Sequence, residues 1–555
     1  MDNLRLVLLL ALGLVGMMLW QAWQKDYGHT PLSVGEDSGT ATVSPKSGES
    51  EDIPTLDRNG AGVVKAEKQT SSAAESSQER IKVKTDTLFL EIDPRGATIR
   101  HAELLQYPVH HNRPQEPFVL LNDTNELYYV VQGGVLSKES APTHEALFQA
   151  DQTEYALAPG RNTLEVPFTW TEEGVTVTKV FEFTRNSYLV NVRYVIDNGT
   201  GENWQGRIYN QIKRDDPGRQ GRKLIYTYTG AVLSSPEKRY QKISFKDISD
   251  EKLSKDITNG WAAMIQHYFI SALIPGNKDD MYHYYTNSVD EKYYTIGAIT
   301  PAIDVAPGKE GNVTEKIYLG PKVQKHLEKI AEGLELTVDY GKLWFIAKPL
   351  FWCLGKLHEL MGNWGWAIIL VTVMLKVLFY RLSAAGYRSM ANMRRVQPRI
   401  MAMRERYKND KTRMNQAMME LYKEEKINPL GGCFPIVIQI PVFIALYWVL
   451  LESVEMRQAN FALWINDLSS PDPYWVLPIL MGVTMFVQQR LNPAPMDPIQ
   501  QKVMMVLPFA FTIFFGFFPS GLVLYWVVNN LLSIGQQWLI TRSLERAGLS
   551  VRPNK

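Results

Sequence analysis

The sequence predicts a polytopic α-helical membrane protein with a large all-β domain between its first helix and the others. Three observations predict this class. The 555-residue chain is 45% hydrophobic but has a mean hydropathy of -0.18, so long polar stretches must offset segments that are almost wholly apolar. Six such segments approach the roughly 20 residues that a helical bilayer crossing needs. Between the first two of them, apolar and polar residues alternate as in half-buried strands.

Composition and charge narrow the possible functions. The 59 basic and 58 acidic residues leave a formal net charge of +1, so any attraction to nucleic acid or anionic lipid must be local. The two cysteines, Cys353 and Cys433, are too few for a disulfide framework and lack the paired spacing of a zinc site. The sequence therefore predicts no structural disulfide and no structural metal, and its balanced charge predicts no DNA partner.

The first apolar segment runs from Leu6 to Trp20. It has the character of a secretory signal, but the apolar run is not followed by a small-residue cleavage pattern. We therefore interpret residues 1–27 as an uncleaved transmembrane signal anchor. Residues 28–80 contain no Phe, Trp or Tyr and carry nine acidic residues against five basic ones. Such a composition cannot bury a core, and it predicts a disordered linker.

Residues 81–330 are predicted to form a large β-sandwich. Alternate residues from Tyr188 to Ile196 are apolar, which is the period-two pattern of a half-buried strand. A turn at Arg185-Asn186-Ser187 joins this strand to the one before it. The expected strands are Ile81–Ile92, Leu127–Val131, Leu164–Trp170, Val175–Phe183 and Tyr188–Ile196.

The same domain offers few candidates for chemistry. Its tryptophans Trp170, Trp204 and Trp261 could stack on a sugar or a peptide, but filling the core is the more common use of such side chains. The pairs His110-His111 and His144-Glu145 lack partners at the spacing of metal ligands. We expect the domain to bind or brace something rather than to catalyse a reaction.

An amphipathic segment precedes the second apolar span. Residues 340–361 mix Trp344, Phe345 and Trp352 with basic side chains, which suits a helix lying in the membrane–water interface. The segment could equally extend the following span, and Pro349 would start or kink any helix here.

Residues 362–545 hold five further apolar spans and a basic loop. The loop, residues 381–426, has 12 basic residues against 5 acidic ones, which indicates the cytoplasmic side. Both chain termini, including the short basic tail 546–555, should then be cytoplasmic, and the β domain should lie outside. The expected spans are Trp364–Leu382, Cys433–Leu451, Tyr474–Val487, Val503–Phe518 and Leu522–Ile540.

Within the basic loop, residues 384–428 are predicted to form an antiparallel helical hairpin broken near Asn409-Asp410. Apolar residues recur at roughly helical spacing on both sides of the break. Its basic face could meet ribosomal RNA or lipid phosphates, although a solvated face is the more common use. The apolar residues are Met390, Met393, Val396, Ile400 and Met403 before the break and Met414, Ala417, Met418 and Leu421 after it.

Polar side chains inside the spans mark candidate functional positions, because each is costly in lipid. Lys376 lies six residues before the predicted end of its span, and a basic side chain at a helix centre costs about 2.5–3.5 kcal/mol. It could snorkel to the inner interface, but together with its polar neighbours it favours a hydrated groove that opens to the cytoplasm. Those neighbours are Thr372 on the same helix face, Gln439, and the stripe Asn529, Ser533, Gln536 and Gln537.

Four strings of the sequence resemble the YidC family of membrane-protein insertases, in order and over nearly the whole chain. They are Asn428-Pro429-Leu430-Gly431-Gly432-Cys433-Phe434-Pro435, Phe461-Ala462-Leu463-Trp464-Ile465, Leu477-Pro478-Ile479-Leu480-Met481-Gly482 and Phe518-Pro519-Ser520-Gly521-Leu522-Val523-Leu524-Tyr525.

The resemblance implies a six-span protein of the bacterial inner membrane with a five-helix insertase core. Its groove would open to cytoplasm and lipid, and its periplasmic domain would be a β-supersandwich without implied catalysis. It implies no enzyme activity and no nucleotide or metal cofactor. The implied partners are nascent membrane proteins, the Sec translocon, membrane lipids and, weakly, the ribosome.

The resemblance also assigns residues to the groove. Thr372 and Tyr525 match groove positions of the family, and Trp526 stands where a second tyrosine is common. Lys376 stands where the family usually has arginine, so the charge is kept while the planar five-donor fork is lost.

Two other functions compete with this interpretation. A solute or ion transporter could use Lys376 in its pathway, but transporters tend to show inverted repeats, and no second half of this sequence echoes the first. A membrane-anchored glycan enzyme would need a pair of carboxylates in the β domain.

Overall fold

The computed structural model describes residues 53–54, 79–124, 127–218, 227–289, 292–407, 410–425, 434–492 and 498–546. The predicted anchor 1–27 and most of the predicted linker 28–80 and of the tail 546–555 lie outside the described residues, as do Cys433 and part of the Asn409-Asp410 break. The chain divides into two compact units. One comprises residues 49–381 and 435–536, and the other comprises residues 1–48, 382–434 and 537–555.

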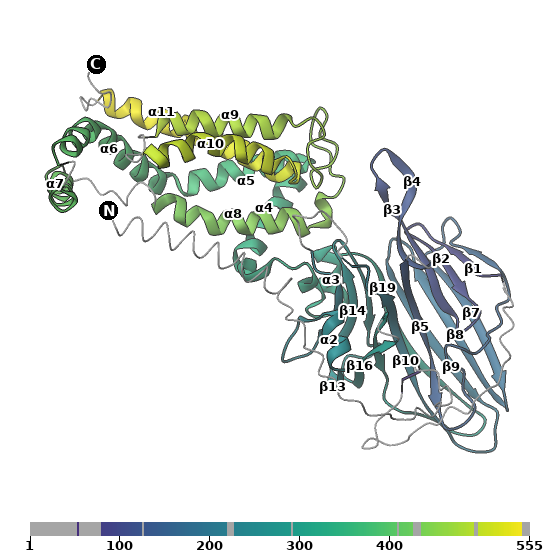
Figure 1. The fold of residues 1–555 in the computed structure, drawn as a ribbon. Coiled ribbons are helices and arrows are strands. Elements are labelled where there is room, and N and C mark those ends of the chain that lie inside the picture. The colour runs from purple at the N-terminus through teal and green to yellow at the C-terminus, as the bar shows by residue number, and fades with distance from the viewer. Residues whose placement is uncertain are drawn as a thin grey trace, which may run out of the picture. The chain divides into compact units, whose positions relative to one another are not determined.

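The β domain consists of two mostly antiparallel sheets (Figure 1). The larger has 11 strands in the order β13-β16-β17-β10-β5-β4-β3-β2-β1-β6, with β18 paired to β10, and the smaller has 8 in the order β12-β11-β14-β15-β19-β9-β8-β7. In chain order the strands are β1 (Ile81–Lys84), β2 (Leu88–Asp93), β3 (Thr98–His110), β4 (Arg113–Thr124), β5 (Leu127–Ser137), β6 (Glu154–Ala156), β7 (Thr163–Glu172), β8 (Val175–Thr184), β9 (Leu189–Asn198), β10 (Trp204–Asp215), β11 (Gly230–Ser234), β12 (Gln241–Ile243), β13 (Ser254–Thr258), β14 (Trp261–Gln266), β15 (Phe269–Ile274), β16 (Met281–Val289), β17 (Tyr293–Ile299), β18 (Ile303–Val305) and β19 (Lys309–Pro321).

The predicted hairpin around Arg185-Asn186-Ser187 is confirmed as β8 and β9, which pair antiparallel from Val175 opposite Asn198 to Phe183 opposite Val190. Asn186 adopts the left-handed conformation, with φ of 56°, that a tight turn requires. The alternate apolar residues of β9 are fully buried, so the period-two pattern identified the buried face correctly.

The tryptophans of the domain serve its core, as the more common use predicts. Trp204 and Trp261 are each 1% exposed, and Trp170 packs against the same core while partly buried. Trp204 and Trp261 therefore cannot stack on a sugar or a peptide from solution, whereas Trp170 keeps part of its surface exposed.

The prediction of one strand from Ile81 to Ile92 is wrong. The chain turns between β1 and β2, and the two strands pair with each other. Thr85 causes the turn, since its hydroxyl oxygen accepts hydrogen bonds from the backbone N–H groups of Thr87 and Leu88, at 3.2 and 2.9 Å. A threonine hydroxyl that bonds its own backbone in this way competes with the strand ladder.

The described chain also contains α-helices, most of which follow the β domain. They are α2 (Phe245–Asp250), α3 (Gln324–Ile330), α4 (Trp344–Met361), α5 (Trp364–Leu378), α6 (Tyr380–Arg406), α7 (Lys411–Glu424), α8 (Phe434–Glu452), α9 (Val476–Leu491), α10 (Pro498–Phe515) and α11 (Ser520–Arg546). None of the helices in the described ranges is by itself long and apolar enough to cross a membrane. The pair α5 and α6, which is bent by 67° at the break between them, reaches the length and apolar composition of a span.

The amphipathic segment is a helix of its own, so the alternative that it extends the next span is wrong. Gly362, with φ of 66°, ends α4, and the Asn363 side chain caps α5 by accepting from Gly365 N at 2.9 Å. Pro349 lies inside α4 and does not start it. Trp344, Phe345 and Trp352 are exposed along α4, as the interfacial interpretation expects.

The span predicted as Trp364–Leu382 is too long, because α5 ends at Leu378. The chain turns at Phe379, whose N–H still bonds to Leu375 O at 2.9 Å. The carbonyl oxygen of Tyr380 lies just past this turn and accepts from Gln536 Nε2 on α11, at 3.5 Å. A side chain from a distant helix thus binds the first residue of α6, directly after the bend.

The predicted packing of the basic loop is confirmed within its own unit. Val396 and Ile400 of α6 form a buried cluster with Met418 and Leu421 of α7. Glu425, which follows α7, closes the pair by binding two α6 arginines, Arg395 at 2.6 Å and Arg399 at 2.7 Å.

Candidate functional site

A small cavity is lined by residues of three helices, α5, α8 and α11, and of the turn after α5. It offers about 20 Å³ to the centres of water molecules, which is room for about one water and far less than an apolar helix needs. In this state the cavity is the size of a water site. Its lining residues are Thr372, Leu375, Lys376, Phe379, Gln439, Val442, Tyr525 and Asn529.

Lys376 reaches this cavity from the last turn of α5. Its Nζ donates a hydrogen bond to Ser533 Oγ on α11 at 2.7 Å, and Ser533 Oγ donates in turn to the Asn529 carbonyl oxygen at 2.7 Å. Among the described residues, the hydrogen-bond acceptor of this ammonium is a neutral hydroxyl and not a carboxylate. A half-buried cation held only by a neutral hydroxyl keeps donors for a further ligand, and an anionic ligand is the most favoured.

The walls of the cavity are held by contacts of their own. Thr372 is 1% exposed, and its hydroxyl donates to Ile368 O at 2.7 Å, which leaves oxygen lone pairs to accept from a group in the cavity. The Tyr525 ring stacks on that of Phe443, with centroids 5.9 Å apart. The polar groups are therefore presented by side chains that packing and back-bonding fix in place.

Three predicted groove residues lie outside the lining. The ring of Trp526 packs between Phe443 and Phe515, at centroid distances of 4.4 and 4.8 Å. Gln536 serves the bend after α5, and its Oε1 has no hydrogen-bond partner among the described residues. Ser533 touches the site through the Lys376 ammonium. Of the polar stripe predicted on α11, only Asn529 therefore lines the cavity itself.

Sequence reasoning missed the apolar part of the lining and one buried amide. Phe379 stands three residues after Lys376, on the same helix face, so the helical period could have identified it. Asn530 is 4% exposed and donates to Thr484 Oγ1 on α9, at 3.2 Å. It lies beside the predicted stripe and links two helices. The missed lining residues are Leu375, Phe379 and Val442.

The histidines of the β domain do not assemble into a site. His144 Nδ1 lies 2.6 Å from the Tyr209 hydroxyl, and His110 and His111 are exposed at the tip of the β3–β4 hairpin. Within the described ranges, no group of three or more His, Cys, Asp or Glu side chains could hold a metal ion.

Two family models together cover most of the chain. The model described as YidC periplasmic domain matches residues 80–353, and the model described as 60Kd inner membrane protein matches residues 356–547. The matches define the class as an inner-membrane protein with an all-β periplasmic domain followed by a helical part.

Relatives of similar length carry one name, membrane protein insertase YidC. The relative from Thioalkalivibrio sulfidiphilus is 50% identical over 99% of this chain and 100% of its own. Those from Methylococcus capsulatus and Pseudomonas aeruginosa are 48% and 45% identical, over 98% and 99% of this chain and 99% of each relative. The chain belongs to the YidC family.

Proposed function

We propose that this chain inserts nascent membrane proteins into the bacterial inner membrane, and that the cavity between α5, α8 and α11 is the deep end of a groove open to cytoplasm and lipid. The observation that carries the proposal is the ammonium of Lys376, which lies among apolar helices and, in the described part of the chain, donates to a neutral acceptor, Ser533 Oγ. The groove residues are Thr372, Lys376, Gln439, Tyr525, Asn529 and Ser533, with Trp526 and Gln536 supporting them from other positions on α11.

The physical role of such a groove is to lower a desolvation barrier. A polar tail that must cross the bilayer loses its water, at a cost of several kcal/mol for each unsatisfied group. In the groove the tail meets the hydroxyl of Thr372, the amides of Gln439 and Asn529, and the Lys376 ammonium. The apolar segment behind the tail then moves into lipid, and its burial at about 25 cal/mol per Å² drives the step.

This work needs no covalent step, so we propose an insertase without enzyme activity and without nucleotide, metal or other cofactor. The proposed arrangement has six spans, both termini in the cytoplasm and the β domain in the periplasm. The chain acts alone on small substrates and with the Sec translocon on others. Membrane lipids border the groove, and the ribosome meets the basic hairpin and tail weakly.

The test is insertion by the purified full chain in lipid vesicles. A single-span protein with an acidic tail is synthesised beside the vesicles, and protection of the tail from added protease reports translocation. We expect protection with the chain present and little in empty vesicles. Equal protection in both would overturn the proposal, and solute or ion flux without tail protection would favour the transporter.

A further inference from the structure

The loop between α8 and α9, residues 453–475, is held by a dense set of hydrogen bonds, and we call it the outer loop. Asp467 is its hub. Its Oδ1 accepts from the backbone N–H of Gln458 at 2.9 Å and of Ser469 at 2.8 Å, and its Oδ2 accepts from Ser470 Oγ at 2.7 Å. Hydrogen bonds to a charged acceptor are about twice as strong as neutral ones, so this carboxylate fixes the path of the loop.

The outer loop binds the first turn of α11. Ser520 N donates to Ser470 O at 2.7 Å, and Gly521 N donates to Leu468 O at 2.9 Å. The Ser520 hydroxyl adds a bond to the Asp467 carbonyl oxygen at 2.8 Å. These bonds satisfy N–H groups that the start of a helix leaves open, and α11 is the helix that carries Asn529 and Ser533.

The loop also binds the start of α5, the helix that carries Lys376. Asn363 Nδ2 donates to Asn460 O at 3.1 Å and to Phe461 O at 2.9 Å. The Phe461 ring lies so close to Gly365 that any side chain at that position would overlap it. One loop thus closes over the ends of both helices that meet at the Lys376–Ser533 hydrogen bond.

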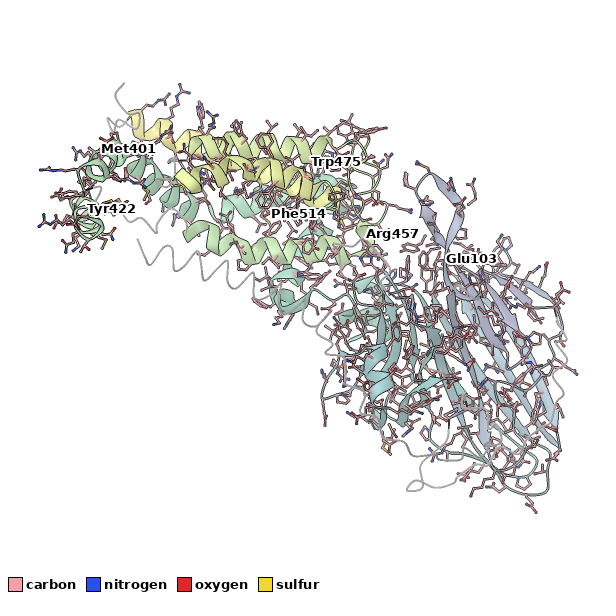
Figure 2. All side chains as sticks on the ribbon, viewed as in Figure 1. Glu103, Met401, Tyr422, Arg457, Trp475 and Phe514 are labelled. Atoms are coloured by element: carbon pink, nitrogen blue, oxygen red, sulfur yellow. The ribbon has the colours of Figure 1, made fainter. Side chains whose placement is uncertain are left out.

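The other side of the outer loop contacts the β domain. Arg457 Nη2 donates to Pro108 O on β3 at 2.6 Å, and Gln458 Nε2 donates to the same oxygen at 2.7 Å. The Arg457 guanidinium also lies 5.9 Å from the ring centroid of Phe118 and 5.5 Å from that of Phe269. Figure 2 labels Arg457 on the loop that follows α8. Gln458 connects the β domain to the outer loop, because its side chain donates to Pro108 O and its backbone N–H donates to Asp467 Oδ1.

The backbone of the outer loop is strained, and contacts must hold it. Gln458, Leu463 and Trp475 have φ values of 57°, 56° and 61°, a left-handed conformation that side chains other than glycine rarely adopt. Strain of this kind persists only where the surroundings over-determine it. The hydrogen bonds that Gln458 donates to Pro108 O and to Asp467 Oδ1 restrain its backbone in this conformation.

A second anchor fixes the helix that leads into the loop. Lys322, directly after β19, forms an ion pair with Glu452 at the end of α8, at 3.4 Å, with both side chains almost fully buried. His267 Nε2 lies 3.0 Å from Leu451 O beside it. A buried pair adds little net stability but disfavours other arrangements, because separation would leave an uncompensated charge.

We propose that the β domain pins the outer loop shut, so that the groove opens to cytoplasm and lipid while its periplasmic end stays closed. The contacts of Arg457 and Gln458 with β3 hold the loop, and the loop holds the first turns of α5 and α11. The inference rests on the proposed function, because it requires the outer loop to face the periplasm.

The test measures access to the loop from outside the cell. In a chain with Cys353→Ser and Cys433→Ser, Leu468→Cys introduces a thiol at a position that is 1% exposed, and a membrane-impermeant maleimide is added externally. Arg457→Ala with Gln458→Gly removes the side-chain bonds to β3, while glycine retains the left-handed backbone and its N–H to Asp467. We expect labelling to accelerate about tenfold, since loss of one or two hydrogen bonds changes an opening equilibrium by that order.

The matched control is Arg113→Ala on the same β3–β4 hairpin, whose described ion pair is with the exposed Glu116. It should label at the parent rate, and a similar acceleration there would overturn the inference. Gln458→Gly alone should give part of the increase even if the double variant fails to accumulate. Unchanged labelling of Leu468→Cys in both variants also overturns the inference and leaves insertion by the groove standing. If Asn466→Cys, at an exposed position of the loop, cannot be labelled from outside, the proposed topology fails and the inference falls with it.

Discussion

At the scale of single residues, Lys376 supplies the positive charge of the proposed groove, and Ser533 accepts a hydrogen bond from its ammonium. The ammonium is a compact charge with three donors, and one hydroxyl can hold it at 2.7 Å. The guanidinium that is usual in the family would present a planar fork of five donors. In the proposed groove, Lys376 would therefore offer a substrate carboxylate a point charge rather than a bidentate grip.

Replacing Lys376 tests whether that point charge matters. Lys376→Arg should retain insertion, whereas Lys376→Leu should lower translocation of acidic tails about tenfold and of neutral tails less, since a tenfold change corresponds to about 1.4 kcal/mol of charge interaction in a partly wet site. Protease protection of the tail at matched protein abundance is the measurement. Equal insertion of an acidic-tailed substrate by Lys376→Leu and the unchanged chain would end the groove-charge hypothesis.

Glu315 of β19 carries a pH dependence within the β domain. Its side chain is 6% exposed and accepts from the Tyr282 hydroxyl at 2.6 Å. Burial raises the pKa of Glu315 from 4.5 to about 8, a rise that the Tyr282 hydrogen bond and Lys316 oppose and that Asp280 supports. Between these two values the native state keeps a proton that the unfolded state has released. The stability contributed by Glu315 is therefore present at low pH and is lost as the pH rises through this window.

Glu315→Gln removes the titration and keeps the shape of the side chain. Relative to this variant, the unchanged chain should lose on the order of 3 kcal/mol of unfolding free energy between pH 5 and pH 8. Urea unfolding of the full chain in detergent, followed by tryptophan fluorescence, to which the buried Trp204 and Trp261 contribute, measures the difference. If the two chains show parallel pH dependences, the carboxyl does not titrate in this window.

At the scale of elements, part of the positive charge of the α6–α7 hairpin is neutralised by ion pairs within the hairpin. Glu425 binds Arg395 and Arg399, so these two arginines are less available to ribosomal RNA or lipid phosphates than composition suggests. Exposed pairs of this kind contribute roughly 0.2–1 kcal/mol each. Charge reversal at these positions would therefore disturb packing and docking together.

A charge swap separates the two roles. Arg395→Glu with Arg399→Glu should loosen the hairpin, because three carboxylates then meet, and chymotrypsin should cut there several-fold faster. Adding Glu425→Arg should restore protection while leaving the local charge negative. If insertion recovers with the swap, the pairs serve packing, and if it stays impaired, the basic face serves docking. Undiminished resistance of the double variant to chymotrypsin would contradict the role given to Glu425.

At the scale of the whole molecule, the proposed mechanism makes no use of the predicted linker. Arg80 belongs to the β domain, since it pairs with Asp123 at 2.7 Å and with Glu91 at 3.3 Å. A clean deletion therefore removes residues 28–78 and spares it. The described part of the linker places Ile53, partly buried, against a cluster of the β domain. We expect insertion of a small single-span substrate to remain within about twofold of the full chain, because a tether contributes mainly reach and this contact lies far from the proposed groove in the sequence. Loss of insertion at normal protein level would contradict this, and Arg80→Ala serves as the control for damage to the domain.

The sequence by itself determined the order of the parts and the class of protein. The periods of two and 3.6 residues identified the β8–β9 hairpin, the faces of the basic helices and the shared face of Thr372 and Lys376, because such periods follow from local backbone geometry. The four strings that resemble the YidC family indicated the function. These signals lie within a few turns of the chain, so no tertiary contact is needed to interpret them.

Only the tertiary structure decided where the polar groups of the spans go. Lys376 donates to Ser533, which lies 157 positions away in the sequence. Trp526 packs between Phe443 and Phe515 and does not line the cavity. Gln536 donates to Tyr380 O directly after a bend that no local sequence pattern predicts. The hydrogen bonds of Gln458 to Pro108 of the β domain and to Asp467 of the outer loop likewise cannot be predicted from the sequence. A side chain's partner depends on which distant segments packing brings together, and a period along one helix specifies a face of that helix but not what lies opposite it.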